Sequence, residues 1–177
     1  MKPKQFNLYT STKIPPFKKT ISVDSDKSQS IRVFIIGSIC QGLTTAKNIL
    51  ESDDVKSTIY ACKKLGVKII KNKHGSYKIY GKGLGSFFAK KNLTINVGNS
   101  GTLSRLLCGI CATTPNIKIK IKGDHSLNKR NMKKLIDLMS SFGAEFLPKN
   151  KFNFPLKMIS TEMPIGINYK AGVSAQL

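Results

Sequence analysis

The stretch GNSGTLSR, residues 98–105, decides how this chain folds. It follows an apolar segment, residues 94–97, that is predicted to be a strand, and it opens a helix predicted for residues 102–113. The helix is indicated by apolar side chains at i, i+3, i+4, i+7 and i+8: Leu103, Leu106, Leu107, Ile110 and Cys111. Small residues let the backbone of the turn approach a ligand, and the start of a helix offers free N–H groups and a positive dipole end.

Arg105 follows Gly101 by four residues, so it lies one turn further along the same face of the predicted helix. Its side chain tilts back toward the N-terminal end. Turn, helix start and arginine together predict a site for an anion. The same pattern is equally typical of an ordinary strand, turn and helix with an arginine on the surface.

The pattern recurs along the chain. The stretch KSQSIR, residues 27–32, also opens a helix, and Ser28 and Arg32 have the same four-residue spacing as Gly101 and Arg105. A third helix start is indicated by GVSAQ, residues 172–176. Lys27 and Gly101 are 74 residues apart, and Gly101 and Ser174 are 73 apart. A repeat of this length predicts one supersecondary unit used three times, whose helix starts would converge on one anionic ligand.

The predicted fold class is α/β, with each unit running βαβαββ. Two units span about residues 20–85 and 93–160, and a third begins at residues 166–177 with only its first strand and helical turn. Residues 1–19 are predicted to be an N-terminal arm or edge strand, and residues 20–177 an incomplete domain. The first unit is expected to have strands at residues 20–23 and 43–50, and the third a strand at residues 166–169. Because one helical turn is not stable alone, we interpret the chain as cut short.

The net charge is +21, from 27 lysines and three arginines against nine acidic residues. Such a surface attracts polyanions, but a nucleic-acid reader would more often use arginine forks and stacking aromatic side chains. Tryptophan is absent, so a solvated basic surface is favoured over a nucleic-acid-binding module. Arginine is kept only at Arg32, Arg105 and Arg130. Its planar fork binds phosphate and carboxylate in a way that lysine cannot copy.

Cys108 and Cys111 form a C-x-x-C pair, but no second pair has the spacing of a metal site. Both fall within the predicted helix and are expected to be buried thiols, so no metal site and no cofactor are predicted. No apolar run approaches the length of about 18 residues that a membrane span needs, and no signal peptide is apparent. A cytoplasmic protein without a membrane partner is therefore expected.

Four motifs resemble those of the 3-phosphoshikimate 1-carboxyvinyltransferase (EPSP synthase) family. They are DKSQSIR at residues 26–32, GNSGT with Arg105 at 98–105, GDHSL with Arg130 at 123–130, and VSAQ at 173–176. Their order and spacing agree with the family. The resemblance runs from about Thr20 to Leu177 and covers less than half of the family's length. Asn131 stands where the family usually has proline.

The resemblance implies an inside-out α/β enolpyruvyl transferase fold, with two similar domains that have helices inside, sheets outside and the substrates between them. The residues implied to bind 3-phosphoshikimate are Lys27, Ser28, Arg32, Ser174, Ala175 and Gln176, with Ala175 acting through its backbone. Those implied to bind phosphoenolpyruvate are Lys27, Gly101, Arg130 and Gln176. Asn99, Thr102 and Arg105 match the motif and are expected to shape the site.

The implied reaction belongs to the shikimate pathway of aromatic amino acid biosynthesis. It transfers the enolpyruvyl group of phosphoenolpyruvate to the 5-hydroxyl of 3-phosphoshikimate and releases phosphate. The resemblance implies that the proton-transferring residues lie in the second domain, beyond Leu177, so no catalytic residue is expected in this chain. The chain is therefore expected to be inactive unless a C-terminal domain or a second chain completes the site. The alternatives are a related transferase acting on UDP-N-acetylglucosamine, a basic nucleic-acid-binding module and an inactive remnant.

Overall fold

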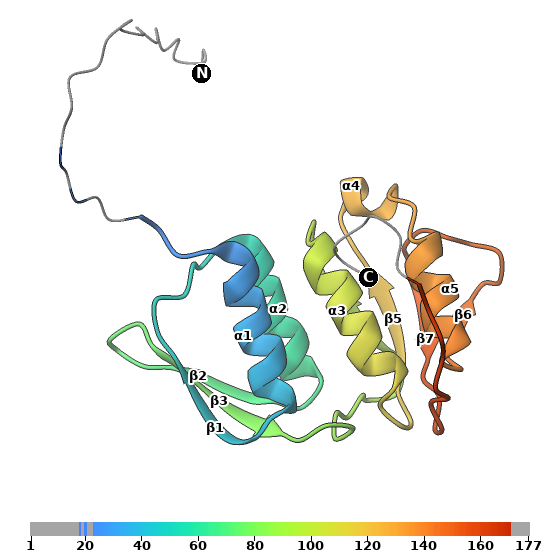
Figure 1. Cartoon of the computed structure of the whole chain (residues 1–177), viewed down its shortest axis with the longest axis horizontal. Coiled ribbons are helices and arrows are strands. Elements are labelled where there is room, and N and C mark those ends of the chain that lie inside the picture. Colours follow the sequence, from blue (N-terminus) through green and yellow to red (C-terminus); the bar gives the residue numbers. More distant parts are fainter. Residues whose placement is uncertain (1–17, 19, 21–22, 171–177) are drawn as a thin grey trace, which may run out of the picture.

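The structure is a computed structural model that describes residues 18, 20 and 23–170. In this part of the chain, the helices and strands form two groups that lie side by side (Figure 1). The helices are α1 (Lys27–Ile39), α2 (Asp53–Lys64), α3 (Gly101–Ala112), α4 (His125–Asn128) and α5 (Lys133–Ser141). The strands are β1 (Gln41–Ala46), β2 (Lys68–Lys71), β3 (Tyr77–Lys82), β4 (Leu93–Asn96), β5 (Lys118–Lys122), β6 (Glu145–Leu147) and β7 (Leu156–Ile159).

The two sheets have the same topology, which confirms the predicted repeat. The first has the strand order β1-β3-β2 and the second the order β4-β5-β7-β6. In each repeat the strand that follows the first helix pairs antiparallel with the last strand, which in turn pairs antiparallel with the strand before it. The second repeat also has a leading strand, β4, which runs parallel to β5.

Equivalent helices begin and end in equivalent ways. At the start of α1 the Asp26 side chain accepts a hydrogen bond from the backbone N–H of Gln29 at 2.6 Å. At the start of α3 the Ser100 hydroxyl accepts one from the backbone N–H of Leu103 at 3.2 Å. Both caps satisfy backbone donors that a helix leaves free. Gly66 and Gly143, with φ of +89° and +105°, follow the ends of α2 and α5, where glycine adopts this backbone conformation without strain.

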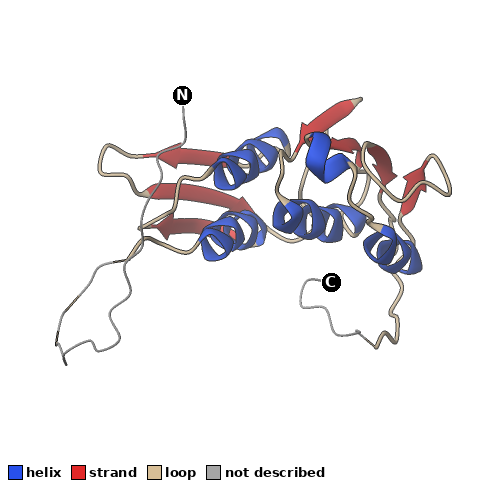
Figure 2. Cartoon of the chain, turned by 90° about the horizontal axis from the view of Figure 1, so that it is seen from above, coloured by secondary structure: helices blue, strands red, loops and turns tan. Residues whose placement is uncertain are grey.

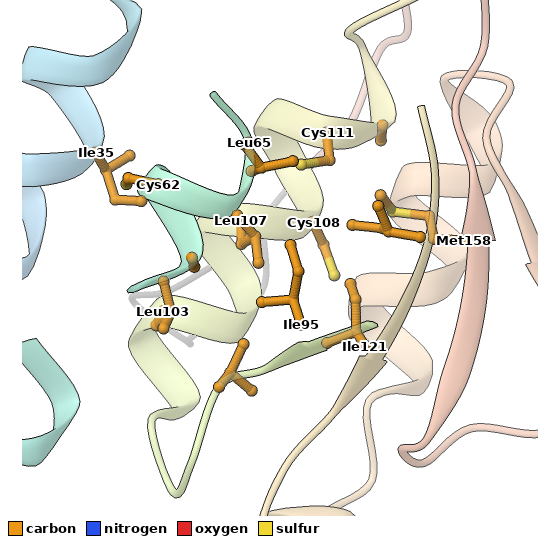
Figure 3. Packing of buried hydrophobic residues seen from close by; sticks show 14 of the residues in the cluster. Ile35, Cys62, Leu65, Ile95, Leu103, Leu107, Cys108, Cys111, Ile121 and Met158 are labelled. Atoms are coloured by element: carbon orange, nitrogen blue, oxygen red, sulfur yellow. The ribbon is translucent and has the colours of Figure 1, made fainter. Parts of the chain in front are cut away.

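One hydrophobic core joins the two repeats, and α3 lies at its centre (Figure 3). Leu65 approaches α3 from the first repeat, while Ile95, Ile121 and Met158 approach it from the second sheet. Seen from above, α1, α3 and α5 follow one another along the molecule (Figure 2). The repeats therefore share apolar surface, and the start of α3 is held in a fixed place relative to both.

The cysteines of α3 belong to this core, as predicted. Cys108 and Cys111 are fully buried, together with Cys62 of α2. Burial disfavours the charged thiolate, which raises the pKa of Cys62 to about 11 and that of Cys108 to about 12. These thiols act as small hydrophobic side chains.

Several boundaries differ from the sequence prediction. The strand expected at residues 43–50 is β1, Gln41–Ala46, because its position is set by pairing with β3. Residues 166–169 form no strand, and no described strand pairs with them. Thr20 and Val23 also lie outside any strand, and the residues between them are not described. The GDHSL motif, at residues 123–127, contains the start of the short helix α4.

The helices of the described residues are all too short or too polar to cross a membrane.

Candidate anion-binding site

A polar pocket of about 320 Å³ lies where three helices begin. Lys27 and Gly101 are the first residues of α1 and α3, and Asp54 is in the first turn of α2. Each of these helix starts contributes the positive end of a dipole. The complete lining is Lys27, Asp54, Asn99, Gly101, Thr102, Arg105 and Arg130.

Two guanidinium groups meet over Gly101. A Cβ atom at this position would lie 3.1 Å from Nη1 of Arg130 and 3.2 Å from Nη1 of Arg105. Arg105 also donates a hydrogen bond to the Gly101 carbonyl at 3.4 Å. A side chain at position 101 would therefore crowd both guanidinium groups and make them shift by a few tenths of an ångström.

Arg130 is held by its neighbours on both sides. Its Nη2 donates a hydrogen bond to Oδ1 of Asn99 at 2.6 Å. Its backbone N–H donates to the Leu127 carbonyl at 3.0 Å, at the end of α4. On the other side, Oδ1 of Asn131 accepts from the backbone N–H of Lys133 at 2.8 Å. This side-chain turn constrains the chain directly after Arg130.

The charges of the pocket are unbalanced. Nζ of Lys27 lies 3.1 Å from Oδ2 of Asp54, the single acidic residue in the lining. Arg105 and Arg130 form no ion pair with any described acidic residue. Two guanidinium groups that pair with no carboxylate lie next to a helix start, and this arrangement favours the binding of an anion.

The structure brings together Lys27, Gly101 and Arg130, three of the residues predicted to bind substrates. Arg32 lies one turn along α1, where its Nη1 donates to the Ser28 carbonyl at 3.2 Å. It lines an adjacent apolar groove of about 350 Å³ between α1, α3 and α5 rather than the polar pocket. Ser174, Ala175 and Gln176 lie outside the described residues.

Asp54 was missed as a site residue from the sequence. Its position at the start of α2 indicates only an acid that suits the helix dipole. It is 27 residues from Lys27, and no spacing rule joins the two. Asn99 and Arg130 are likewise 31 residues apart in sequence. Only the packing of the helices shows these pairs.

The architecture is that of an α/β protein built from βαβαββ repeats, with a cationic pocket where the helices of both repeats begin. The family model described as EPSP synthase (3-phosphoshikimate 1-carboxyvinyltransferase) matches residues 11–177. The chain belongs to this family.

Individual relatives agree with this assignment. The chain is 35% identical to 3-phosphoshikimate 1-carboxyvinyltransferase of Ruegeria sp. (strain TM1040), over 95% of this chain and 37% of the relative. It is also 35% identical to the enzyme of that name from Novosphingobium aromaticivorans, over 99% and 38%. Among solved structures, EPSP synthase from Acinetobacter baumannii superposes with a TM-score of 0.79 at 32% identity, over 88% and 36%. The chain thus spans somewhat more than a third of the length of these relatives.

Proposed function

We propose that this chain forms one wall of the active site of a 3-phosphoshikimate 1-carboxyvinyltransferase. The reaction transfers the enolpyruvyl group of phosphoenolpyruvate to the 5-hydroxyl of 3-phosphoshikimate. The observation that carries the proposal is the meeting of Lys27 and two arginines at the start of α3, around Gly101. Membership of the EPSP synthase family supports the same activity and does not favour a nucleic-acid-binding module.

Phosphoenolpyruvate carries a phosphate and a carboxylate, and the pocket offers a partner for each. We assign its binding to Lys27, Gly101 and Arg130. The fork of Arg130 can make two parallel hydrogen bonds to either group, and its orientation is supported by Asn99. Gly101 leaves room beside the guanidinium groups and brings the free N–H groups of α3 within reach of the anion.

We assign 3-phosphoshikimate to the first turns of α1. Lys27 and Ser28 begin this helix and Arg32 follows about one turn later, so we propose that the phosphate lies beside a helix start with two cations and a hydroxyl near it. Lys27 lies between the two assigned positions and would contact both substrates. Ser174, Ala175 and Gln176 remain part of this proposal through the family motif alone.

The chemistry also needs proton transfers. The 5-hydroxyl loses a proton as its oxygen bonds to C2 of phosphoenolpyruvate, and the C3 methylene gains a proton, which gives a tetrahedral adduct. The adduct then loses a proton from C3 as phosphate leaves C2, which restores the double bond. A positioned acid and base accelerate such steps. Asp54, the one acid in the pocket lining, is paired with Lys27. We therefore propose that the proton-transferring groups come from the part of the enzyme that the relatives have and this chain does not cover. We also propose that the reaction takes place in the cytoplasm.

The test is phosphate release from phosphoenolpyruvate and 3-phosphoshikimate. We expect no turnover by the chain alone, and turnover when the remaining part of the Acinetobacter baumannii enzyme is added as a second polypeptide. Lys27→Ala should abolish the restored activity, whereas Lys56→Ala should not, because Lys56 is exposed on α2 and its one ion pair among the described residues is with Asp53.

Two results would contradict the proposal. One is a stable complex of the two polypeptides that binds neither substrate. The other is turnover with UDP-N-acetylglucosamine in place of 3-phosphoshikimate, which would assign the chain to the related transferase.

A further inference from the structure

A second, larger groove lies on the outer face of the second sheet, away from the site described above. Its volume is about 710 Å³. The buried side chains of β5, Ile119 and Ile121, face the helices, so the alternate residues Lys118 and Lys120 face outward into solvent. The groove contains five exposed lysines: Lys90, Lys91, Lys118, Lys120 and Lys157. We call this surface the lysine groove.

The lysines of this groove are placed against one another. Lys120 of β5 is directly opposite Lys157 of β7 in the antiparallel register. The Cβ atoms of such pairs are about 4.5–5.5 Å apart, and like charges in this position destabilise a sheet. Among the described residues, no ammonium group of the five lysines forms an ion pair, and no acidic residue lines the groove. The unliganded protein therefore carries a concentrated, uncompensated positive charge there.

We propose that the lysine groove binds linear inorganic polyphosphate. A chain of phosphates with a negative charge on each unit matches ammonium groups that lie this close together. The lining has no aromatic side chain on which a base could stack and no arginine that could read a base edge, so nucleic acid gains nothing from its bases. It also lacks the large exposed apolar side chains with which a protein inserts into a membrane surface.

The proposal is tested by titrating the chain with long-chain polyphosphate at several salt concentrations. Binding by counterion release weakens linearly as the logarithm of salt rises, with a slope proportional to the number of charges neutralised. Removing two of five lysines in the double variant Lys120→Gln/Lys157→Gln should lower the slope by about two-fifths. The matched control is Lys73→Gln/Lys78→Gln, which removes the same charge from exposed positions on the β2–β3 hairpin and should leave the slope close to that of the parent.

Thermal melting gives a second readout. Polyphosphate should raise the Tm of the parent and of the control by more than it raises the Tm of the groove variant. The groove variant should itself melt higher without ligand, because its opposed charges are gone. An equal loss of slope in both double variants would overturn the proposal, as would no binding by the parent. If oligothymidylate bound equally well or more tightly, the proposal would be overturned and the ligand would be a nucleic-acid backbone instead of polyphosphate. Because no residue assigned to the substrates lines the groove, these outcomes are independent of the transferase activity.

Discussion

Replacing Gly101 with alanine should separate the stability of the fold from the binding of the anion. Gly101 is the first residue of α3 and its backbone is helical, so alanine can adopt the same conformation. By restricting the unfolded chain, the substitution should stabilise the fold by about 0.4–1 kcal/mol. The new methyl group, however, would lie 3.1–3.2 Å from Nη1 of Arg130 and Arg105, closer than ordinary van der Waals contact.

Both guanidinium groups must then move by a few tenths of an ångström, and the methyl group takes space that the anion would use. The loss of one charge-assisted hydrogen bond costs about 1–3 kcal/mol. The affinity for phosphoenolpyruvate should therefore fall by about 5- to 150-fold. The measurements are urea unfolding for stability and an NMR chemical-shift titration for binding.

Gly109→Ala is the matched control, because Gly109 lies further along the same helix and nothing is within 4 Å of its Cβ position. We expect this variant to be stabilised by about 0.5–1 kcal/mol with unchanged binding. The reasoning would be refuted if Gly101→Ala bound phosphoenolpyruvate as tightly as the parent. It would also be refuted if both variants lost affinity equally, since the effect would then come from the helix and not from the guanidinium groups.

Three further outcomes are expected. Arg130→Lys should weaken phosphoenolpyruvate binding by about 1–3 kcal/mol in calorimetry although the charge is kept, because lysine lacks the planar fork; unchanged affinity would mean that Arg130 is only a surface charge. A thiol reagent should label exposed Cys40 quickly and buried Cys62, Cys108 and Cys111 only on unfolding, and fast labelling of more than one thiol in the folded chain would contradict the described burial. The free energy of unfolding should fall above pH 9, because the folded state keeps protons on thiols whose pKa is about 11 for Cys62 and about 12 for Cys108 while the unfolded chain loses them. Each such thiol contributes about 1.4 kcal/mol per pH unit, so Cys108→Ala should make the decline measured by urea unfolding at pH 9–11 shallower, and an identical decline would exclude this cause.

The repeat, the helix starts and the burial of the cysteines of α3 were all predictable from the sequence. These features depend on residues close together in the chain: capping side chains at Asp26 and Ser100, and apolar side chains spaced to face one side of a helix. The same local signals indicated that Gly101 and Arg105 share a helix face. Their contact in the structure follows from helix geometry alone.

Contacts between residues far apart in the sequence became known only from the tertiary structure. The ion pair of Lys27 with Asp54 and the hydrogen bond of Arg130 to Asn99 depend on how separate elements pack, and their sequence spacing carries no signal. The bounds of β1 and the opposition of Lys120 and Lys157 were fixed in the same way. A strand makes its backbone hydrogen bonds to a neighbouring strand, whereas a helix makes them within itself. The limits of a strand and its cross-strand neighbours are therefore known only from the folded chain.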